Sequence, residues 1–259
     1  MSLKLKITNK YSESITLTQN KAFAVAQVTG LTPPPATINT APIATKDGSL
    51  FNSAFLENRN IVILLYPTGA PETQRVNLYK YLKAKQKIRL ELETKTRAVY
   101  IDGYIESLEG DLYENPQSLQ ASIICPDPYF KAQTPIVKTF ASASEEITNT
   151  SDEESGAVFE ITASGAAENP TLTNDTTGES YTINYSLQTG DKITLNTRRG
   201  EKSLTLTRGG TTTNILNAMA PSSRWISVIP GANTLSYTAA AGSEALALKM
   251  TLEPIFEGI

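Results

Sequence analysis

Period-two alternation of apolar and polar residues marks the start of the chain, over residues 3–7 and 14–17. Successive side chains of a strand point to opposite faces, so this pattern predicts half-buried strands in a hairpin or meander. The run Ile61–Tyr66 is continuously apolar and predicts a strand covered on both faces. Similar patterns predict strands at residues 22–28, 88–92, 98–107 and 118–124.

One segment of this half has helical periodicity. Pro71 and Glu72 suit the first turn of a helix, and lysines at positions 80, 83, 85 and 87 would complement the dipole at its other end. The spacing predicts a helix from Pro71 to about Lys87 that covers one face of a sheet. Its apolar side would consist of Val76, Leu78, Tyr79 and Leu82.

The second half of the chain reads as short strands separated by turn residues. This pattern is typical of a β-sandwich or jelly roll. One helical turn is expected at residues 214–219, ended by Pro221, and residues 131–155 lack a strong period, which indicates a solvated connector or edge segment. The seven predicted strands are residues 157–161, 180–185, 192–196, 203–207, 225–229, 234–237 and 246–252.

The two halves meet at the sequence CPDPYF, residues 125–130. Its two prolines lack a backbone donor and favour extended geometry in the residues before them, so a strand must end there. The net charge changes from +2 before this point to -5 after it. We therefore expect a mainly β protein of two domains: residues 1–130, an α+β domain with a sheet and one helix, and residues 131–259, a β-sandwich.

Composition removes several classes of function. The chain has 259 residues and a net charge of -3, which argues against nucleic-acid binding through bulk charge. It has no histidine and one cysteine, Cys125, so histidine triads, histidine-ligated metals and intrachain disulfides are excluded. No secretion signal or run of about 20 apolar residues is present, so we expect synthesis in a cytoplasm and no membrane insertion.

Motifs for catalysis or cofactor binding are weak. The segment Gly200–Ser203 contains Lys-Ser but lacks the glycines of a phosphate-binding loop. Glu91 and Glu93 share one strand face, whereas a glycosidase pair is usually held on separate elements. The segment Asp175–Glu179 lacks the spacing of a calcium-binding loop. The sequence therefore predicts no catalytic residue, no metal and no cofactor.

A proline-rich segment after the third predicted strand suggests an arm. Residues 33–35 are three consecutive prolines and cannot donate to a strand ladder. An extended apolar segment with few internal partners gains most by contacting a neighbouring subunit. The alternatives are a flexible surface loop and, for the two phenylalanines, core packing. The candidate inter-subunit contacts are Pro33, Pro34, Pro35, Ile38, Phe51 and Phe55.

Two further candidates lie in the second half. Arg198, Arg199 and Arg208 form a basic group in an acidic domain, which indicates either solvated surface or docking to an acidic partner. Trp225, the only tryptophan, would either stack on a sugar or pack between sheets.

Four stretches of sequence stand out by their order and motifs. They are residues 47–63, the helical segment 73–93, residues 97–109 with the closing strand SLQASIICPDPYF, and the C-terminal segments GDKITLNTRRGEKSLTL and RWISVIPGANTLSY. Together they resemble the distal tail protein family of long-tailed bacteriophages. The strand ending in Cys-Pro-Asp-Pro-Tyr-Phe is the most specific of these features.

The resemblance implies a non-enzymatic virion protein, made in the bacterial host. Its N-terminal domain would form a homohexameric ring at the distal end of the tail, and its C-terminal domain would be a galectin-like sandwich. The implied partners are the tail tube protein, the tail-associated tip protein and receptor-binding proteins. The alternatives are a baseplate hub component of a contractile tail or bacteriocin, a carbohydrate-binding module, and a wall hydrolase acting through Glu or Asp.

Overall fold

The computed structural model describes residues 3–111 and 113–259. The chain divides into two compact units, which we call the first unit (residues 1–133 and 256–259) and the second unit (residues 134–255). The sequence placed the boundary after Phe130 and assigned every later residue to the second domain. In the structure the last four residues return to the first unit, because Phe256 lies in its core.

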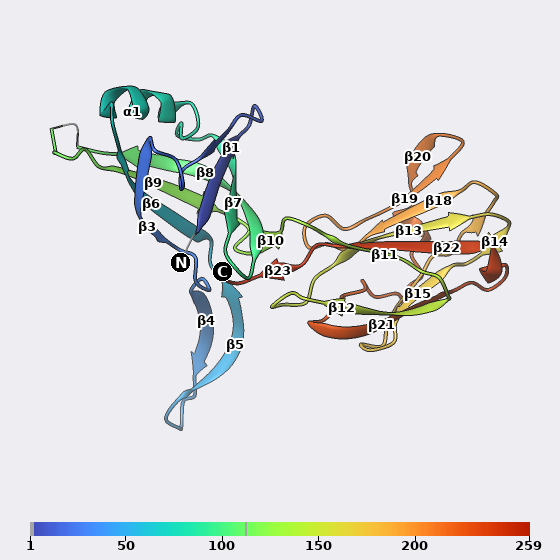
Figure 1. Ribbon diagram of the computed structural model, residues 1–259. Coiled ribbons are helices and arrows are strands. Elements are labelled where there is room, and N and C mark those ends of the chain that lie inside the picture. Colours follow the sequence, from blue (N-terminus) through green and yellow to red (C-terminus); the bar gives the residue numbers. More distant parts are fainter. Residues whose placement is uncertain (1–2, 112) are drawn as a thin grey trace. The chain divides into compact units, whose positions relative to one another are not determined.

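The first unit is built on a curved antiparallel sheet with the strand order β2-β1-β7-β8-β9-β6-β3 (Figure 1). Short strand β10 (Phe130–Ala132) pairs with β8 and with β23 (Ile255–Phe256). The strands predicted in this half are all present, within a few residues of their expected bounds. They are β1 (Lys4–Asn9), β2 (Ser14–Thr16), β3 (Phe23–Thr29), β6 (Arg59–Pro67), β7 (Lys87–Glu93), β8 (Ala98–Glu109) and β9 (Leu119–Cys125).

The core of the first unit collects the alternate residues of these strands. On β6, Ile61, Ile63 and Leu65 are fully buried, whereas the intervening residues keep part of their surface in solvent. The prediction that this strand is covered on both faces is therefore wrong for the second face. Close packing inside the sheet requires a glycine at position 103, where a Cβ would lie 2.8 Å from Cys125 Sγ.

The helix α1 (Pro71–Tyr79) is shorter than predicted. It ends early because the chain must enter β7 beside β8, where the Lys85 amide donates to Ile105 O at 2.8 Å and Lys85 takes a positive φ of 67°. The four lysines thus lie beyond the helix. Leu78 and Leu82 are buried as expected, but Val76 and Tyr79 of the predicted apolar side are exposed.

The second unit is a β-sandwich, as predicted. One sheet has the order β11-β22-β13-β18-β19-β20 and the other β12-β21-β15-β16; a separate pair joins β14 to β17. The bounds are β11 (Ile136–Thr139), β12 (Ser144–Asn149), β13 (Ala157–Ala163), β14 (Ala167–Glu168), β15 (Thr171–Asn174), β16 (Glu179–Thr182), β17 (Ser186–Leu187), β18 (Lys192–Asn196), β19 (Ser203–Arg208), β20 (Thr211–Asn214), β21 (Gly231–Thr238) and β22 (Leu246–Leu252).

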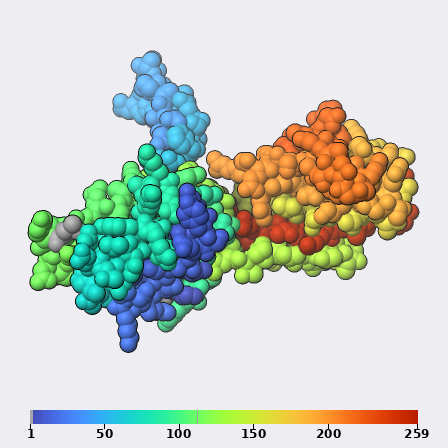
Figure 2. All heavy atoms as spheres, turned by 90° about the horizontal axis from the view of Figure 1, so that it is seen from above, coloured from blue at the N-terminus to red at the C-terminus, as the bar shows by residue number. Residues whose placement is uncertain are grey.

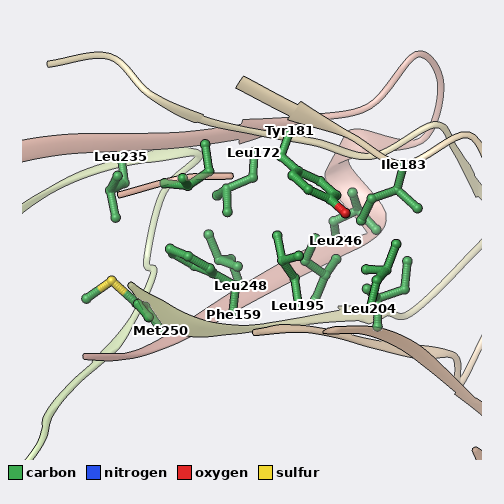
Figure 3. Close-up of a cluster of buried hydrophobic side chains, with 14 of the residues drawn as sticks. Phe159, Leu172, Tyr181, Ile183, Leu195, Leu204, Leu235, Leu246, Leu248 and Met250 are labelled. Atoms are coloured by element: carbon green, nitrogen blue, oxygen red, sulfur yellow. The ribbon is translucent and has the colours of Figure 1, made fainter. Parts of the chain in front are cut away.

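The sandwich core lies between the two sheets (Figure 3). Leu172 and Leu235 project from one sheet toward Phe159, Leu248 and Met250 of the other. All five side chains are fully or almost fully buried. Two single-turn 3₁₀ helices, η1 (Leu216–Ala218) and η2 (Ser243–Ala245), complete the unit, and η1 falls in the predicted helical turn.

The segment 131–155, expected as a solvated connector or an edge segment, contains β11 and β12, and each lies at the edge of its sheet. Their polar side chains face solvent while alternate residues such as Ile147 reach the core. One prediction for this half is wrong. The expected strand 225–229 forms only one isolated bridge, between Ser155 and Val228. Side-chain hydrogen bonds take the place of strand pairing in this segment. Asn149 Nδ2 donates to Val228 O at 2.8 Å, and Asn174 Nδ2 donates to Ser227 O at 2.7 Å.

Candidate assembly surface

A two-stranded hairpin projects from the first unit and pairs with no other strand in the described part of the chain (Figure 1). Its strands are β4 (Ala36–Pro42) and β5 (Ser49–Leu56), and we call residues 36–56 the arm. Figure 2 shows the arm standing clear of the body of the first unit. An isolated hairpin of this kind is marginally stable in water, so the arm gains stability by covering its surface.

The arm exposes four large apolar side chains. Ile38 is 63% exposed, Leu50 60%, Phe51 67% and Phe55 55%. The alternative that the two phenylalanines pack in the core is therefore wrong. Exposed large apolar side chains gathered on one element are typical of a surface that binds another molecule.

Both faces of the arm carry these groups. Ile38 pairs with Ala54 and Thr40 with Phe51 on one face, with a bulge between these pairs. Phe55 and Leu50 lie on the opposite face. The only charged residues within the arm are Lys46 and Asp47 between its strands. Each face of the ribbon thus carries two large apolar side chains and no charge, and depletion of charge is typical of the centre of a protein interface.

The three prolines lie at the base of the arm and not on its strands. The Pro35 carbonyl accepts a hydrogen bond from Glu57 N at 3.1 Å, which closes the base. Pro33 packs so tightly on residue 258 that a Cβ there would lie 3.1 Å from Pro33 Cδ. The prolines therefore set the path into the arm, while Ile38, Phe51 and Phe55 form its exposed surface.

Arg59 holds the base from inside. Its side chain is 2% exposed, and its guanidinium donates to four backbone carbonyls at 2.5–2.7 Å. The acceptors are four backbone carbonyls. Those of Gly30 and Thr32 precede the arm, that of Pro128 follows β9, and that of Glu257 lies in the segment 256–259. Burial lowers the pKa of Arg59, yet an arginine keeps its charge in proteins.

Residues 256–259 pack beside the same base. Arg97 donates to the Gly258 carbonyl and lies 4.4 Å from the ring centroid of Phe256. The Ile259 amide donates to Leu31 O at 3.1 Å. Sequence reasoning missed Arg59 and these residues; the only local signal was one arginine at the start of an apolar strand.

The arginines of the second unit do not form one patch. Arg198 and Arg199 lie in the turn between β18 and β19, whereas Arg208 ends β19 at the other end of that hairpin. Arg198 pairs with Glu253 at 3.7 Å, and Arg208 pairs with Asp191. Arg199 is exposed.

Trp225 is partly buried against the sandwich core. Its ring packs on Tyr181 with centroids 5.2 Å apart, and Lys202 Nζ lies 5.3 Å from its centroid. The nearby Asn233 is fully buried and holds the Pro230-Gly231 turn, since its amide donates to Ile229 O at 2.7 Å. Packing of the Trp225 ring and the turn held by Asn233 thus account for the sequence RWISVIPGANTLSY.

Among residues 3–111 and 113–259, no group of three or more acidic or cysteine side chains is arranged to hold a metal ion. The described residues also include no helix long and apolar enough to cross a membrane. Burial raises the pKa of Cys125 to about 12, so this thiol is not a nucleophile at neutral pH.

Residues 150–251 match a protein family that is described as the C-terminal domain of the siphovirus-type tail component. The chain is a structural component of a phage tail, located in the virion. No curated protein matches the chain.

Solved structures extend the similarity over both units. The Dit protein of phage SPP1 matches with a TM-score of 0.73 and 16% identity, over 97% of this chain and 99% of that chain. Two structures of the phage P2 baseplate in its activated conformation, with Ca and with Sr, match with TM-scores of 0.54 and 0.53. Both have 14% identity over the full length of each chain. The resemblance to the phage distal tail protein family is confirmed.

Proposed function

We propose that the chain forms a homohexameric ring at the distal end of the tail, which joins the tail tube to the tip and receptor-binding apparatus. The ring acts mechanically and catalyses no reaction. Its partners are further copies of itself, the tail tube protein, the tail-associated tip protein and receptor-binding proteins. The chain is synthesised in the bacterial host before assembly.

The proteins of similar fold support this role. The SPP1 protein is described as a paradigm of the hub adsorption apparatus in phages that infect Gram-positive bacteria. The P2 structures are baseplates. The match of fold over both units makes the same architectural position the best proposal for this chain.

The exposed arm is the observation that supports the proposed self-assembly. A ring needs heterologous contacts, in which one surface of each copy meets a different surface of the next. A hairpin that is held firmly at its base and exposed on both faces supplies one such surface. Full burial of Ile38 and Phe51 contributes roughly 1.5–3 kcal/mol for each side chain.

A double variant, Ile38→Ser with Phe51→Ser, tests the proposal. We expect the unchanged chain to give the mass of six copies by light scattering after size exclusion, and a ring in negative-stain images. The variant should give single copies with an unchanged circular dichroism spectrum. The matched control is Val137→Ser, which removes a side chain 53% exposed on the second unit and should leave the ring intact.

A ring formed by the double variant at the same protein concentration would contradict the role of the arm. A purified chain that remains a single copy at high concentration would contradict self-assembly itself.

A further inference from the structure

A solvent-open hollow of about 520 Å³ lies in the second unit, lined by six residues. The lining residues are Asn169, Asn184, Tyr185, Ser186, Gln188 and Arg208. Most of the exposed surface of the hollow is polar, and one wall is aromatic.

Four of the six lining side chains make no hydrogen bond within the described part of the chain. No side-chain hydrogen bond joins Asn169, Asn184, Tyr185 or Gln188 to any residue that the structure describes. Three amides and one phenol therefore offer both donors and acceptors at one place. An amide can donate and accept at once, which is the requirement for binding a hydroxyl group.

The arginine is fixed in position. Arg208 Nε donates to Asp191 Oδ1 at 2.8 Å and Nη2 to Asp191 Oδ2 at 2.5 Å, while Nη2 also lies 3.3 Å from Ser186 O. Asp191 is 2% exposed, so this pair is anchored in the body of the unit. The bidentate geometry orients the guanidinium. The same carboxylate balances its charge, so a ligand needs no negative charge of its own.

Backbone contacts hold the walls together. Glu168 pairs with Ser186 across the two-stranded β14–β17 sheet, and the backbone N–H of Asn169 donates to Tyr185 O at 3.1 Å. Asn169 has a positive φ of 50°. The Tyr185 ring is partly exposed and lies 5.7 Å from the Arg208 guanidinium carbon. The Arg208 guanidinium thus lies over the Tyr185 ring, and the exposed part of that ring borders the hollow.

We propose that this hollow binds a neutral saccharide unit. The amides and the arginine would bond to vicinal hydroxyl groups, and the Tyr185 ring would pack on the apolar face of the sugar ring. This site replaces Trp225 as the candidate sugar contact, because the indole is partly buried against Tyr181. The proposal concerns the second unit and does not depend on ring formation.

Saturation-transfer NMR on the full chain tests the site. The probes are glucose, galactose, rhamnose and N-acetylglucosamine, with glycerol phosphate as the anionic comparison. An open site of this size should bind at least one neutral sugar with a Kd on the order of 1 mM. Tyr185→Ala and Asn184→Ala should each weaken that binding by about tenfold, the effect of a lost contact of about 1.4 kcal/mol.

Matched controls separate the hollow from general surface effects. Tyr11→Ala removes a tyrosine that is 70% exposed on the first unit, and Arg199→Ala removes an exposed arginine of the second unit. Neither should change the signal, and all variants should keep the melting temperature of the unchanged chain.

Three results would overturn the proposal. They are the absence of transfer to every neutral sugar, binding of glycerol phosphate alone, and equal loss of binding in the hollow variants and the controls.

Discussion

Replacement of Arg59 by methionine should strongly destabilise the first unit and leave the second unit unchanged. Methionine keeps much of the apolar stem volume but has no donor. The substitution therefore removes the four hydrogen bonds to backbone carbonyls while limiting the cavity that it leaves.

The magnitude follows from the contacts. Each of the four carbonyls becomes a buried acceptor without its donor, at a cost of about 1 kcal/mol or more. The contact between the guanidinium carbon and the Phe130 ring, 4.4 Å from its centroid, contributes about 1 kcal/mol further. Relief of the arginine's desolvation offsets part of this sum, since a buried ion carries a penalty of several kcal/mol. We expect a net loss of about 4 kcal/mol.

Urea unfolding measures this loss with an internal control. The only tryptophan, Trp225, belongs to the second unit, so its fluorescence follows that unit, while circular dichroism follows both. With a slope of about 2 kcal/mol per M, the first-unit midpoint should fall by about 2 M. The Trp225 transition should not move.

Two comparison variants sharpen the result. Arg59→Lys keeps the charge but lacks the planar fork that reaches diverging carbonyls, so we expect about half the loss. Arg89→Met removes a half-exposed arginine that pairs with Asp102 on the same unit, and such pairs contribute at most about 1 kcal/mol. A midpoint shift for Arg59→Met no larger than that for Arg89→Met, or an equal shift of the Trp225 transition, would refute the reasoning.

Three further changes probe packing and electrostatics. Tyr181→Phe should raise the unfolding midpoint of the second unit by the equivalent of about 1 kcal/mol, because the buried Tyr181 hydroxyl has no hydrogen-bond partner among the described residues. Denaturant unfolding followed by circular dichroism measures this shift. Gly103→Ala should destabilise the first unit by about 1–3 kcal/mol, since its Cβ would contact Cys125 Sγ at 2.8 Å, and a higher melting temperature would contradict this. The hydrogen bonds from Arg208 lower the pKa of Asp191. Its contribution to stability is therefore present above the unfolded pKa of about 3.9 and is lost as pH falls through the lower folded value. Melting temperatures between about pH 2 and 6 should fall less steeply for Asp191→Asn, and parallel curves would refute the assignment.

Regular alternation made most strands predictable. In β1, β7 and β18 every second residue is buried, so the sequence carries the orientation of each side chain directly. The same reasoning predicted the sandwich of the second unit. It left the choice between a connector and an edge segment open for residues 131–155, because β12 has only Ile147 and Asn149 buried and such an edge strand has no clear apolar face.

The remaining errors have a common physical origin, which is the dominance of tertiary contacts over local pattern. Residues 225–229 alternate like a strand but are held by the side chains of Asn149, Asn174 and Glu179. Each of these lies more than 45 positions away in sequence, so no local window contains the interaction. The hollow around Arg208 escaped prediction for the same reason, because its walls come from separate strands and loops.

The position of Arg59 links the arm to a distant part of the sequence. Its partners at Gly30 and Thr32 precede the arm, whereas its partner at Glu257 is 198 positions further along the chain. The whole second unit lies between them in sequence. The base of the arm is therefore completed only when residues 256–259 have folded back onto the first unit. Because a two-stranded ribbon has little stability of its own, its orientation depends on that base. A fragment ending at residue 133 would therefore present the arm without the Glu257 contact.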